Sequence, residues 1–169
     1  MKTRLLGALV GLAISFALPT FAQQKEPTLS EQEQAEKTAV DHALHDYNEA
    51  FGRGDLSAIG QHCNVPFVSI FPEGVGVKVL ATMSEIEAGY GGYLKGLRER
   101  GYSHSIPSEL HVKLLDQITA LASGVFVRQK TDGSELETIG GTYVLRKTEG
   151  EWKIAVMMRT PPANIIRAV

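Results

Sequence analysis

The chain has 169 residues, with 17 Lys and Arg against 19 Asp and Glu, and a formal net charge of −2. A mildly acidic chain without clusters of basic residues argues against nucleic acid and anionic membranes as partners. Cys63 is the single cysteine, so there is no internal disulfide and stability must come from packing. The length predicts one domain with a real hydrophobic core.

Residues 1–22 have the layout of a secretory signal peptide. Lys2 and Arg4 precede an apolar run from Leu5 to Leu18, and small residues lie around Ala22. The run is shorter than the roughly 20 apolar residues of a membrane span, although a retained membrane anchor is the alternative. We therefore expect cleavage after Ala22, a periplasmic or secreted location, and no membrane contact of the mature chain.

The polar residues 23–30 form an expected flexible lead-in to the first helix. Ser30 and Glu33 have the spacing of a capping box, which predicts that a helix begins there. Its apolar positions then recur at helical spacing, at Val40, Leu44, Tyr47 and Phe51. Glycines end this helix, and Asp55 caps a short second helix.

The middle of the chain predicts two strands and a third helix. Apolar runs at 65–71 and 75–80 surround Pro72-Glu73-Gly74, a strand-turn-strand pattern. Ser84 and Glu87 repeat the capping-box spacing and predict the start of the third helix. Gly101 is expected to end it.

Beyond Tyr102 the apolar period changes to two, which predicts strands. Turn signals at Asp132-Gly133 and Glu149-Gly150 predict two hairpins. Helices first and a four-stranded antiparallel meander last predict an α+β fold.

Tight turns at these two positions fix the expected cross-strand pairs. The first hairpin sets Arg128 opposite Glu137 and Lys130 opposite Glu135, two favourable charge pairs. The second sets Leu145 opposite Ile154 and Tyr143 opposite Val156. A bulge at Gly140-Gly141 would shift the register before Thr142.

These registers predict the composition of both sheet faces. The face expected beneath the helices is apolar and holds Phe126, Ile139, Tyr143, Leu145, Trp152, Ile154, Val156 and Met158. The opposite face is mixed and is a candidate surface for homodimer formation; it holds Thr142, Val144, Arg146, Lys153, Ala155 and Met157.

Three stretches carry a resemblance to a known family. They are Tyr47, Ala50 and Phe51 before Gly54-Asp55, then Pro72-x-Gly74, and finally Tyr143–Lys147 with Glu149–Ile154. In this order they resemble the nuclear transport factor 2-like, or SnoaL-like, superfamily, which includes ketosteroid isomerases and polyketide cyclases. The resemblance implies a cone-shaped α+β roll, with N-terminal helices packed on a curved antiparallel sheet around a blind apolar pocket. We place this domain at 31–160 and a C-terminal tail at 161–169.

The resemblance also locates two catalytic positions of the isomerases. Tyr47 stands eight residues before Asp55, where those enzymes have a tyrosine that donates a hydrogen bond to the forming oxyanion. Their general base, a carboxylate, falls on Phe71, which cannot accept a proton. The last-strand histidines of many relatives fall on Val156 and Met158. Tyr47 is therefore the one catalytic candidate, and a core helix position is its alternative reading.

The implied pocket is aromatic and apolar. Its expected lining consists of Tyr47, Phe71, Tyr90, Tyr93, Phe126, Tyr143, Trp152, Val156 and Met158. The favoured hypothesis is an exported domain that binds a small hydrophobic ligand or acts as a homodimeric partner module. The alternative is an isomerase, cyclase or dehydratase that uses Tyr47 as an electrophile.

Other polar residues give weaker signals. His42, His45 and Asp46 have passable metal-ligand spacing on one helix, but no second cluster completes a site, so a solvated helix face is the preferred interpretation. We expect no metal and no cofactor. Arg128 is the one cation placed to meet an anionic ligand, and its expected partner Glu137 offers the simpler explanation.

Overall fold

A computed structural model describes residues 30–71 and 76–167. The elements follow in the order α1 (Glu31–Arg53), α2 (Leu56–Gln61), β1 (Cys63–Phe71), β2 (Gly76–Leu80), α3 (Met83–Glu99), β3 (Tyr102–Leu114), β4 (Thr119–Lys130), β5 (Glu135–Thr148), β6 (Glu151–Thr160) and a 3-10 turn (Pro162–Asn164). Within these ranges, none of the helices has the length and apolar character to cross a bilayer.

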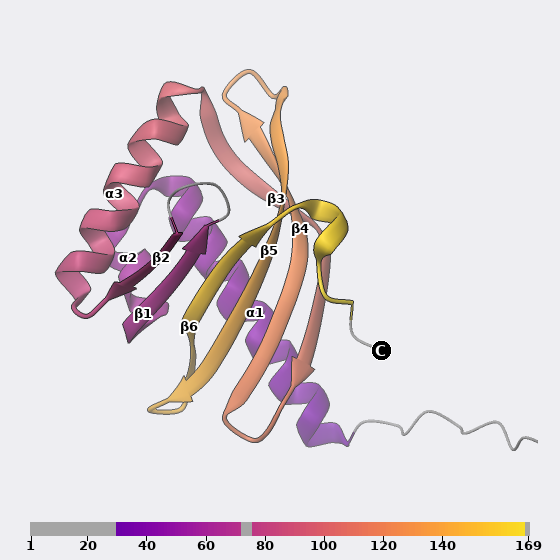
Figure 1. Cartoon of the computed structure of the whole chain (residues 1–169). Helices are drawn as coiled ribbons and strands as arrows, with labels where there is room; N and C mark the ends of the chain where they lie inside the picture. Colours follow the sequence, from indigo (N-terminus) through magenta and orange to yellow (C-terminus); the bar gives the residue numbers. More distant parts are fainter. Residues whose placement is uncertain (1–29, 72–75, 168–169) are drawn as a thin grey trace, which may run out of the picture.

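The six strands form one curved sheet in the order β2-β1-β6-β5-β4-β3. In Figure 1, α1 runs along one face of this sheet, while α2 and α3 lie near the end formed by β1 and β2. The predicted α+β fold is confirmed. The sheet is mixed rather than wholly antiparallel, because β1 pairs in parallel with β6 and so joins the predicted meander to the strand-turn-strand pair.

The first helix begins as its sequence predicts. Ser30 Oγ accepts a hydrogen bond from the Glu33 amide at 3.2 Å, and Glu33 Oε2 accepts one from the Ser30 amide at 2.8 Å. The third helix begins two residues earlier than predicted. Thr82 is its cap, with Glu85 as the reciprocal partner, so the predicted Ser84 start was wrong. The pairs Thr82–Glu85 and Ser84–Glu87 have the same capping-box spacing. Thr82 is the cap because its backbone is extended.

The predicted apolar stripe of α1 faces the sheet and forms the centre of the core. Its buried residues are Val40, Leu44, Tyr47, Ala50 and Phe51. They pack with buried residues of α3 and of the strands, among them Ile86, Tyr90, Phe67, Ala122, Leu145 and Ile154. Burial of this stripe, rather than helix propensity, holds α1 against the sheet.

The hairpin registers agree with the prediction at some positions and differ at others, including next to the first turn. Arg128 pairs with Glu137, and Leu145 pairs with Ile154, as expected. The pairing of Lys130 with Glu135 was wrong, since a register shift after Arg128 places Gln129 opposite Glu135.

A bulge in β6 changes which side chains face the helices. The register shifts between Leu145↔Ile154 and Val144↔Val156, which leaves Ala155 as the extra residue. Tyr143 therefore pairs with Met157, and its predicted pairing with Val156 was wrong.

Side chains beyond the bulge exchange faces relative to the prediction. Met157 joins the core and is 8% exposed. Val156 and Met158 pair with Val144 and Thr142 on the opposite face. The proposed bulge at Gly140-Gly141 was also wrong, because the register there is continuous.

The segment after β6 packs on the sheet face opposite α1. Ile165 is 6% exposed, and the Ile166 amide donates a hydrogen bond to Ser123 Oγ at 2.9 Å. Arg167 forms an ion pair with Glu109. Thr142, which hydrogen-bonds Ser123 on this face, is consequently 4% exposed rather than part of an open surface.

We predict that Gly140→Ala destabilises the fold. A Cβ at Gly140 would lie 2.6 Å from Thr160 Oγ1 and 2.8 Å from the Pro161 carbonyl oxygen. Such overpacking typically costs about 1–3 kcal/mol. Gly96→Ala is the control, because its Cβ would meet nothing within 4 Å and removing a helical glycine stabilises by up to about 1 kcal/mol. Urea unfolding followed by circular dichroism measures both; a Gly140→Ala protein as stable as the wild type would contradict the prediction.

Candidate functional site

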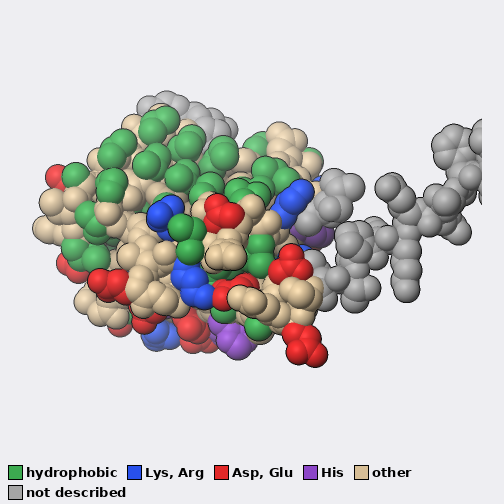
Figure 2. Space-filling model, turned by 90° about the horizontal axis from the view of Figure 1, so that it is seen from below, with side chains coloured by type: hydrophobic (Ala, Val, Ile, Leu, Met, Phe, Trp, Pro, Cys, Tyr) green, Lys and Arg blue, Asp and Glu red, His purple; other side chains and the backbone are tan. Residues whose placement is uncertain are grey.

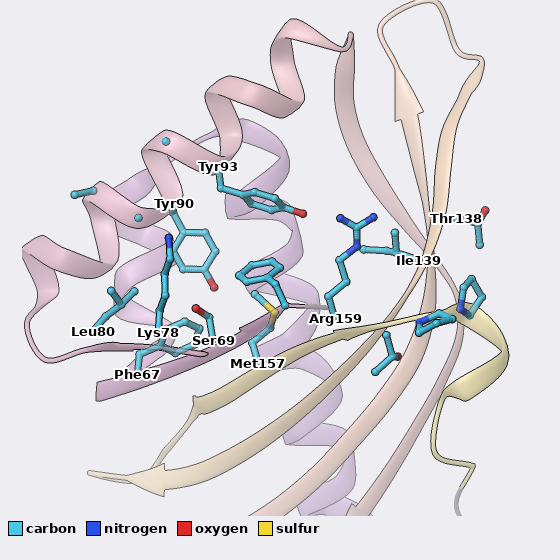
Figure 3. Close-up of a pocket in the computed structure, with 17 residues that line it drawn as sticks. Phe67, Ser69, Lys78, Leu80, Tyr90, Tyr93, Thr138, Ile139, Met157 and Arg159 are labelled. Carbon is cyan, nitrogen blue, oxygen red and sulfur yellow. The ribbon is translucent and has the colours of Figure 1, made fainter. Parts of the chain in front are cut away.

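The larger of two adjoining cavities lies between α3, β1, β2 and the far ends of β5 and β6. Its volume is about 710 Å³. Figure 3 shows its walls, with tyrosines from α3 above the strands and Arg159 reaching in from β6. We call it the outer cavity; its lining includes Phe67, Ser69, Phe71, Lys78, Leu80, Ala88, Tyr90, Gly92, Tyr93, Ile139, Met157, Arg159 and Pro161.

The inner cavity lies deeper, between α1 and the sheet, and measures about 40 Å³. It is lined by residues that include Tyr47, Phe51, Ser105, Phe126, Arg128, Gly141, Tyr143 and Met158. Five further residues line both cavities and form what we call the shared wall: Phe71, Tyr93, Ile139, Met157 and Arg159. Phe71 and Tyr93 contact one another there, with ring centroids 5.4 Å apart.

The predicted pocket residues divide between these two spaces. Phe71 and Tyr93 line both cavities and Tyr90 lines the outer one, while Tyr47, Phe126 and Tyr143 line the inner one. Met158 also borders the inner cavity, although its register in β6 belongs to the sheet face opposite α1. Trp152 and Val156 line neither. Trp152 is a core residue whose indole N–H donates a hydrogen bond to Glu36 at 2.9 Å. Val156 lies on the opposite sheet face because of the bulge in β6.

Tyr47 is tied to Tyr90 rather than directed into the outer cavity. Their hydroxyl oxygens are 2.9 Å apart, and the residues are only 4% and 5% exposed. Burial raises the pKa of both tyrosines well above the ordinary value, so both remain protonated. One hydroxyl donates to the other, and this bond joins α1 to α3 across the core.

The neighbouring thiol has no sign of activation. Cys63 is buried beside these tyrosines, and burial raises its pKa to about 12. A thiol with such a pKa is almost entirely protonated at neutral pH and is a poor nucleophile. Its role is that of a small core residue.

Three arginines share one carboxylate beside the shared wall. Glu137 accepts hydrogen bonds from Arg128 at 2.7 Å, from Arg100 at 3.0 Å and from Arg159 at 3.3 Å. Burial alone would raise the pKa of Glu137, but the hydrogen bonds from Arg100 and Arg128 and the charge of Arg159 hold it below its usual value. The carboxylate is therefore ionised at neutral pH and is a weak proton acceptor.

The guanidinium group of Arg128 is enclosed by aromatic rings. The residue is 5% exposed, and its Cζ lies 5.4 Å from the Tyr93 ring centre, 5.8 Å from Tyr102 and 6.0 Å from Phe51. Burial alone would lower the pKa of Arg128, but the nearby Tyr93 hydroxyl and Glu137 raise it. Arg128 Nε and Tyr93 Oη are both buried, and neither makes a well-formed hydrogen bond among the described residues. Two unsatisfied polar atoms thus lie where the two cavities meet.

The described residues supply no base inside either cavity. Among residues 30–71 and 76–167, no Asp, Glu or His lines the outer or the inner cavity. The same residues contain no group of His, Cys, Asp or Glu that could hold a metal ion. Phe71, the residue that the resemblance aligns with the general base of the isomerases, lies in the shared wall. Glu73, the next carboxylate along the chain, lies outside the described residues.

Sequence reasoning missed Arg159, Ser69 and Lys78 as lining residues. The Arg159 position follows from the β6 bulge, since the register pairs Arg159 with Gly141 and Met157 with Tyr143 on the face towards α1. A continuous register would have placed Arg159 on the opposite face. Because side chains alternate along β1, Phe67, Ser69 and Phe71 lie on the same side of the strand. This alternation could have predicted Ser69 as a lining residue.

A family model described as "NTF2-like protein (DUF6841)" matches residues 33–162. The chain belongs to this NTF2-like family. No curated protein matches it significantly in sequence.

Solved structures show the same fold. An NTF-2 like protein from Shewanella oneidensis has a TM-score of 0.58 at 20% identity, covering 73% of this chain and 98% of that one. An NTF2-like protein with a cystatin-like fold from Novosphingobium aromaticivorans has a TM-score of 0.62 at 15% identity, covering 75% and 82%. A ketosteroid isomerase-like protein from Erwinia carotovora atroseptica has a TM-score of 0.55 at 18% identity, covering 73% and 94%.

We predict that the Tyr47–Tyr90 pair acts as a structural unit. Tyr47→Phe leaves the buried Tyr90 hydroxyl without this partner, which costs about 1–3 kcal/mol of unfolding free energy. The double variant Tyr47→Phe/Tyr90→Phe should cost less than the sum of the two single variants, because neither hydroxyl is then left unpaired. Denaturant unfolding of all four proteins gives the coupling. Additive effects would show that the hydroxyls do not depend on one another.

Proposed function

We propose that this NTF2-like domain is exported and binds a small, largely apolar ligand in its outer cavity. The observation that carries the proposal is the cavity itself, whose volume of about 710 Å³ lies within the usual range of roughly 300–1,000 Å³ for small-molecule sites. Its walls are mostly apolar and aromatic, with a few polar groups from Ser69, Lys78, Tyr90 and Arg159. Such a lining supplies hydrophobic affinity and a small number of orienting contacts.

Binding is favoured over catalysis by the chemistry of the walls. Proton transfer between carbon atoms needs a base within hydrogen-bond reach of the substrate. The polar groups of the described lining are hydroxyls, the Asn48 amide, Lys78 and two arginines, with no carboxylate or imidazole that could serve as the base. Glu137 is ionised but held by three arginines.

An enzyme of the isomerase, cyclase or dehydratase kind is the second candidate, supported by the structural likeness to a ketosteroid isomerase-like protein. In that case Tyr47 would act as the electrophile. Tyr47 reaches the outer cavity only through Tyr90, whose ring lines it. A Tyr90 hydroxyl that receives a hydrogen bond from Tyr47 is a stronger donor to a ligand carbonyl than an isolated phenol.

Export remains part of the proposal on the basis of residues 1–22, which lie outside the described residues. Their basic start, apolar run and small residues around Ala22 support cleavage and a periplasmic or secreted location.

A homodimer is the second part of the proposal. The sheet face opposite α1 carries an apolar stripe across neighbouring strands, formed by Val77, Val79, Val68, Ile70, Val156, Met158, Val144 and Leu121. Val77 and Val79 are 64% and 63% exposed. Figure 2 shows hydrophobic side chains gathered along the upper side of the view, which is the front of Figure 1. An apolar surface of this kind is typical of protein interfaces. Met157, expected on this face, instead lies in the core.

We predict that Gly92→Leu blocks ligand binding. Gly92 lines the outer cavity, and a Cβ there would meet nothing within 4 Å, so the leucine side chain would occupy ligand space. Gly96→Leu is the matched control, since Gly96 lies on the same helix, is equally open and lines neither cavity. Fluorescence titration with Nile red, a neutral apolar probe, should show at least a tenfold loss for Gly92→Leu alone. Equal binding by both variants would place the probe elsewhere and contradict the proposal.

We predict no ketosteroid isomerisation. General base catalysis typically contributes about 10²–10⁴-fold, and Phe71 occupies the position of that base. Incubation with an unsaturated 3-ketosteroid should give no shift in ultraviolet absorbance above the uncatalysed rate. Turnover that is abolished by Tyr47→Phe would refute this and support the second candidate, with Glu73→Gln as the next variant to measure.

We predict that the chain is a dimer at micromolar concentration and that Val144→Arg makes it monomeric. Val144 lies within the apolar stripe, between Val156 and Leu121, and a charge there would be desolvated at an interface. Leu115→Arg is the control, because Leu115 is 55% exposed and lies outside the strands. Light scattering measures the mass. A monomeric wild type, or a dimer unaffected by Val144→Arg, would contradict the prediction of a dimer formed through this stripe.

A further inference from the structure

The junction of the two cavities carries more positive than negative charge. Arg159 belongs to the shared wall, and Arg128 lines the inner cavity directly behind it. Both contact Glu137, which is also bound by Arg100. One carboxylate therefore faces three guanidinium groups. Because these groups stay protonated at all physiological pH values, the cluster attracts a further anion.

The junction also presents hydrogen-bond donors that the protein does not use. Arg128 Nε carries an N–H and Tyr93 carries an O–H, and both atoms are buried without a partner among the described residues. Arg128 is 5% exposed, so its unused N–H is not compensated at an open surface. Buried polar groups are almost always satisfied, and an unsatisfied pair that lines a cavity indicates a missing acceptor.

We propose that the ligand of the outer cavity is an amphipathic anion whose carboxylate is bound at this junction by Arg159, Arg128 and Tyr93. The inference rests on the proposed ligand-binding function and specifies the chemical class of the ligand. A carboxylate has the acceptor oxygens that these donors lack, and hydrogen bonds between charged groups are stronger than neutral ones. In Figure 3 the hydroxyl of Tyr93 and the guanidinium group of Arg159 project towards one another across the cavity, from α3 and from β6.

The cavity sizes fit a ligand with a small head and a large body. The inner cavity, at about 40 Å³, exceeds the roughly 10–15 Å³ that one water-sized group needs, so a carboxylate fits there. The outer cavity, at about 710 Å³, has room for a ring system or a branched apolar chain. Phe71, Ile139 and Met157, which belong to the shared wall, would contact the first carbon atoms of that body.

Two simpler occupants make different predictions. An ordered water could satisfy both unused donors, and a neutral carbonyl oxygen could accept the same hydrogen bonds. Neither would make binding depend on the charge of the ligand. The charge dependence of affinity therefore separates a carboxylate site from both alternatives.

The experiment compares two ligands of nearly equal shape, pyrene-1-butyrate and its neutral amide, by fluorescence titration of the full mature chain. We expect the carboxylate to bind about tenfold to a hundredfold more tightly than the amide, as charge-assisted hydrogen bonds contribute in proteins. The preference should weaken only modestly with added salt, because the junction is buried.

Arg159→Gln and Arg100→Gln form a matched pair of variants. Each removes one positive charge and one contact to Glu137, but only Arg159 lines the cavities. Arg159→Gln should abolish most of the preference for the carboxylate and leave the affinity for the amide unchanged. Arg100→Gln should keep the preference. Tyr93→Phe should weaken carboxylate binding severalfold while the ligand-free protein melts at the same or a higher temperature, since an unsatisfied buried hydroxyl is removed.

Each result decides the question. Equal affinity of acid and amide, or an equal effect of the two arginine variants, overturns the carboxylate site while the ligand-binding function stands. Binding of Nile red without binding of either pyrene compound also overturns the carboxylate site and leaves the ligand-binding function standing. If none of the three probes binds, the proposed function falls, and this inference falls with it.

Discussion

One extra residue in β6 determines what the interior of this domain can do. The bulge at Ala155 shifts the β5–β6 register by one position, so that Met157 and Arg159 face α1 while Val156 and Met158 face the other side. Because strand side chains alternate, a single insertion exchanges every later residue between the two faces. Without it, Arg159 would lie on the opposite face, outside the cavities. The bulge therefore adds a second arginine to a pocket that Arg128 already lines.

The buried charge of Arg128 is a second constraint on the interior of the domain. A guanidinium group removed from water is costly unless charges and hydrogen bonds compensate for it. Glu137 supplies the opposite charge, and the rings of Tyr93, Tyr102 and Phe51 surround the cation within 6.0 Å. Compensation is still incomplete, because Arg128 Nε has no partner among the described residues. This incomplete compensation is one of the observations on which the proposed carboxylate ligand rests.

The sequence predicts the elements well and the interior less well, for physical reasons that particular residues show. Helical periodicity located the α1 stripe, and the Ser30–Glu33 capping box located its start, because both depend on nearby residues alone. Turn geometry gave the pairs Arg128↔Glu137 and Leu145↔Ile154 correctly, although the register next to Asp132-Gly133 is shifted by one residue. Ala155 has no local signature of a bulge. Every inference that crossed it, such as the positions of Val156, Met157 and Met158, was inverted.

Tyr47 shows the limit of assigning catalytic roles to this chain from its resemblance to the isomerases. Its position in the helix matches that of the isomerase tyrosine, yet its hydroxyl meets Tyr90, and Phe71 fills the place of the base. An oxyanion stabiliser accelerates proton abstraction only when a base removes the proton, and the described lining of both cavities holds no Asp, Glu or His. Donors that would stabilise a developing anion in an enzyme also bind a permanent one. Arg128 and Arg159 beside these cavities are the residues on which the proposed binding of a permanent carboxylate rests.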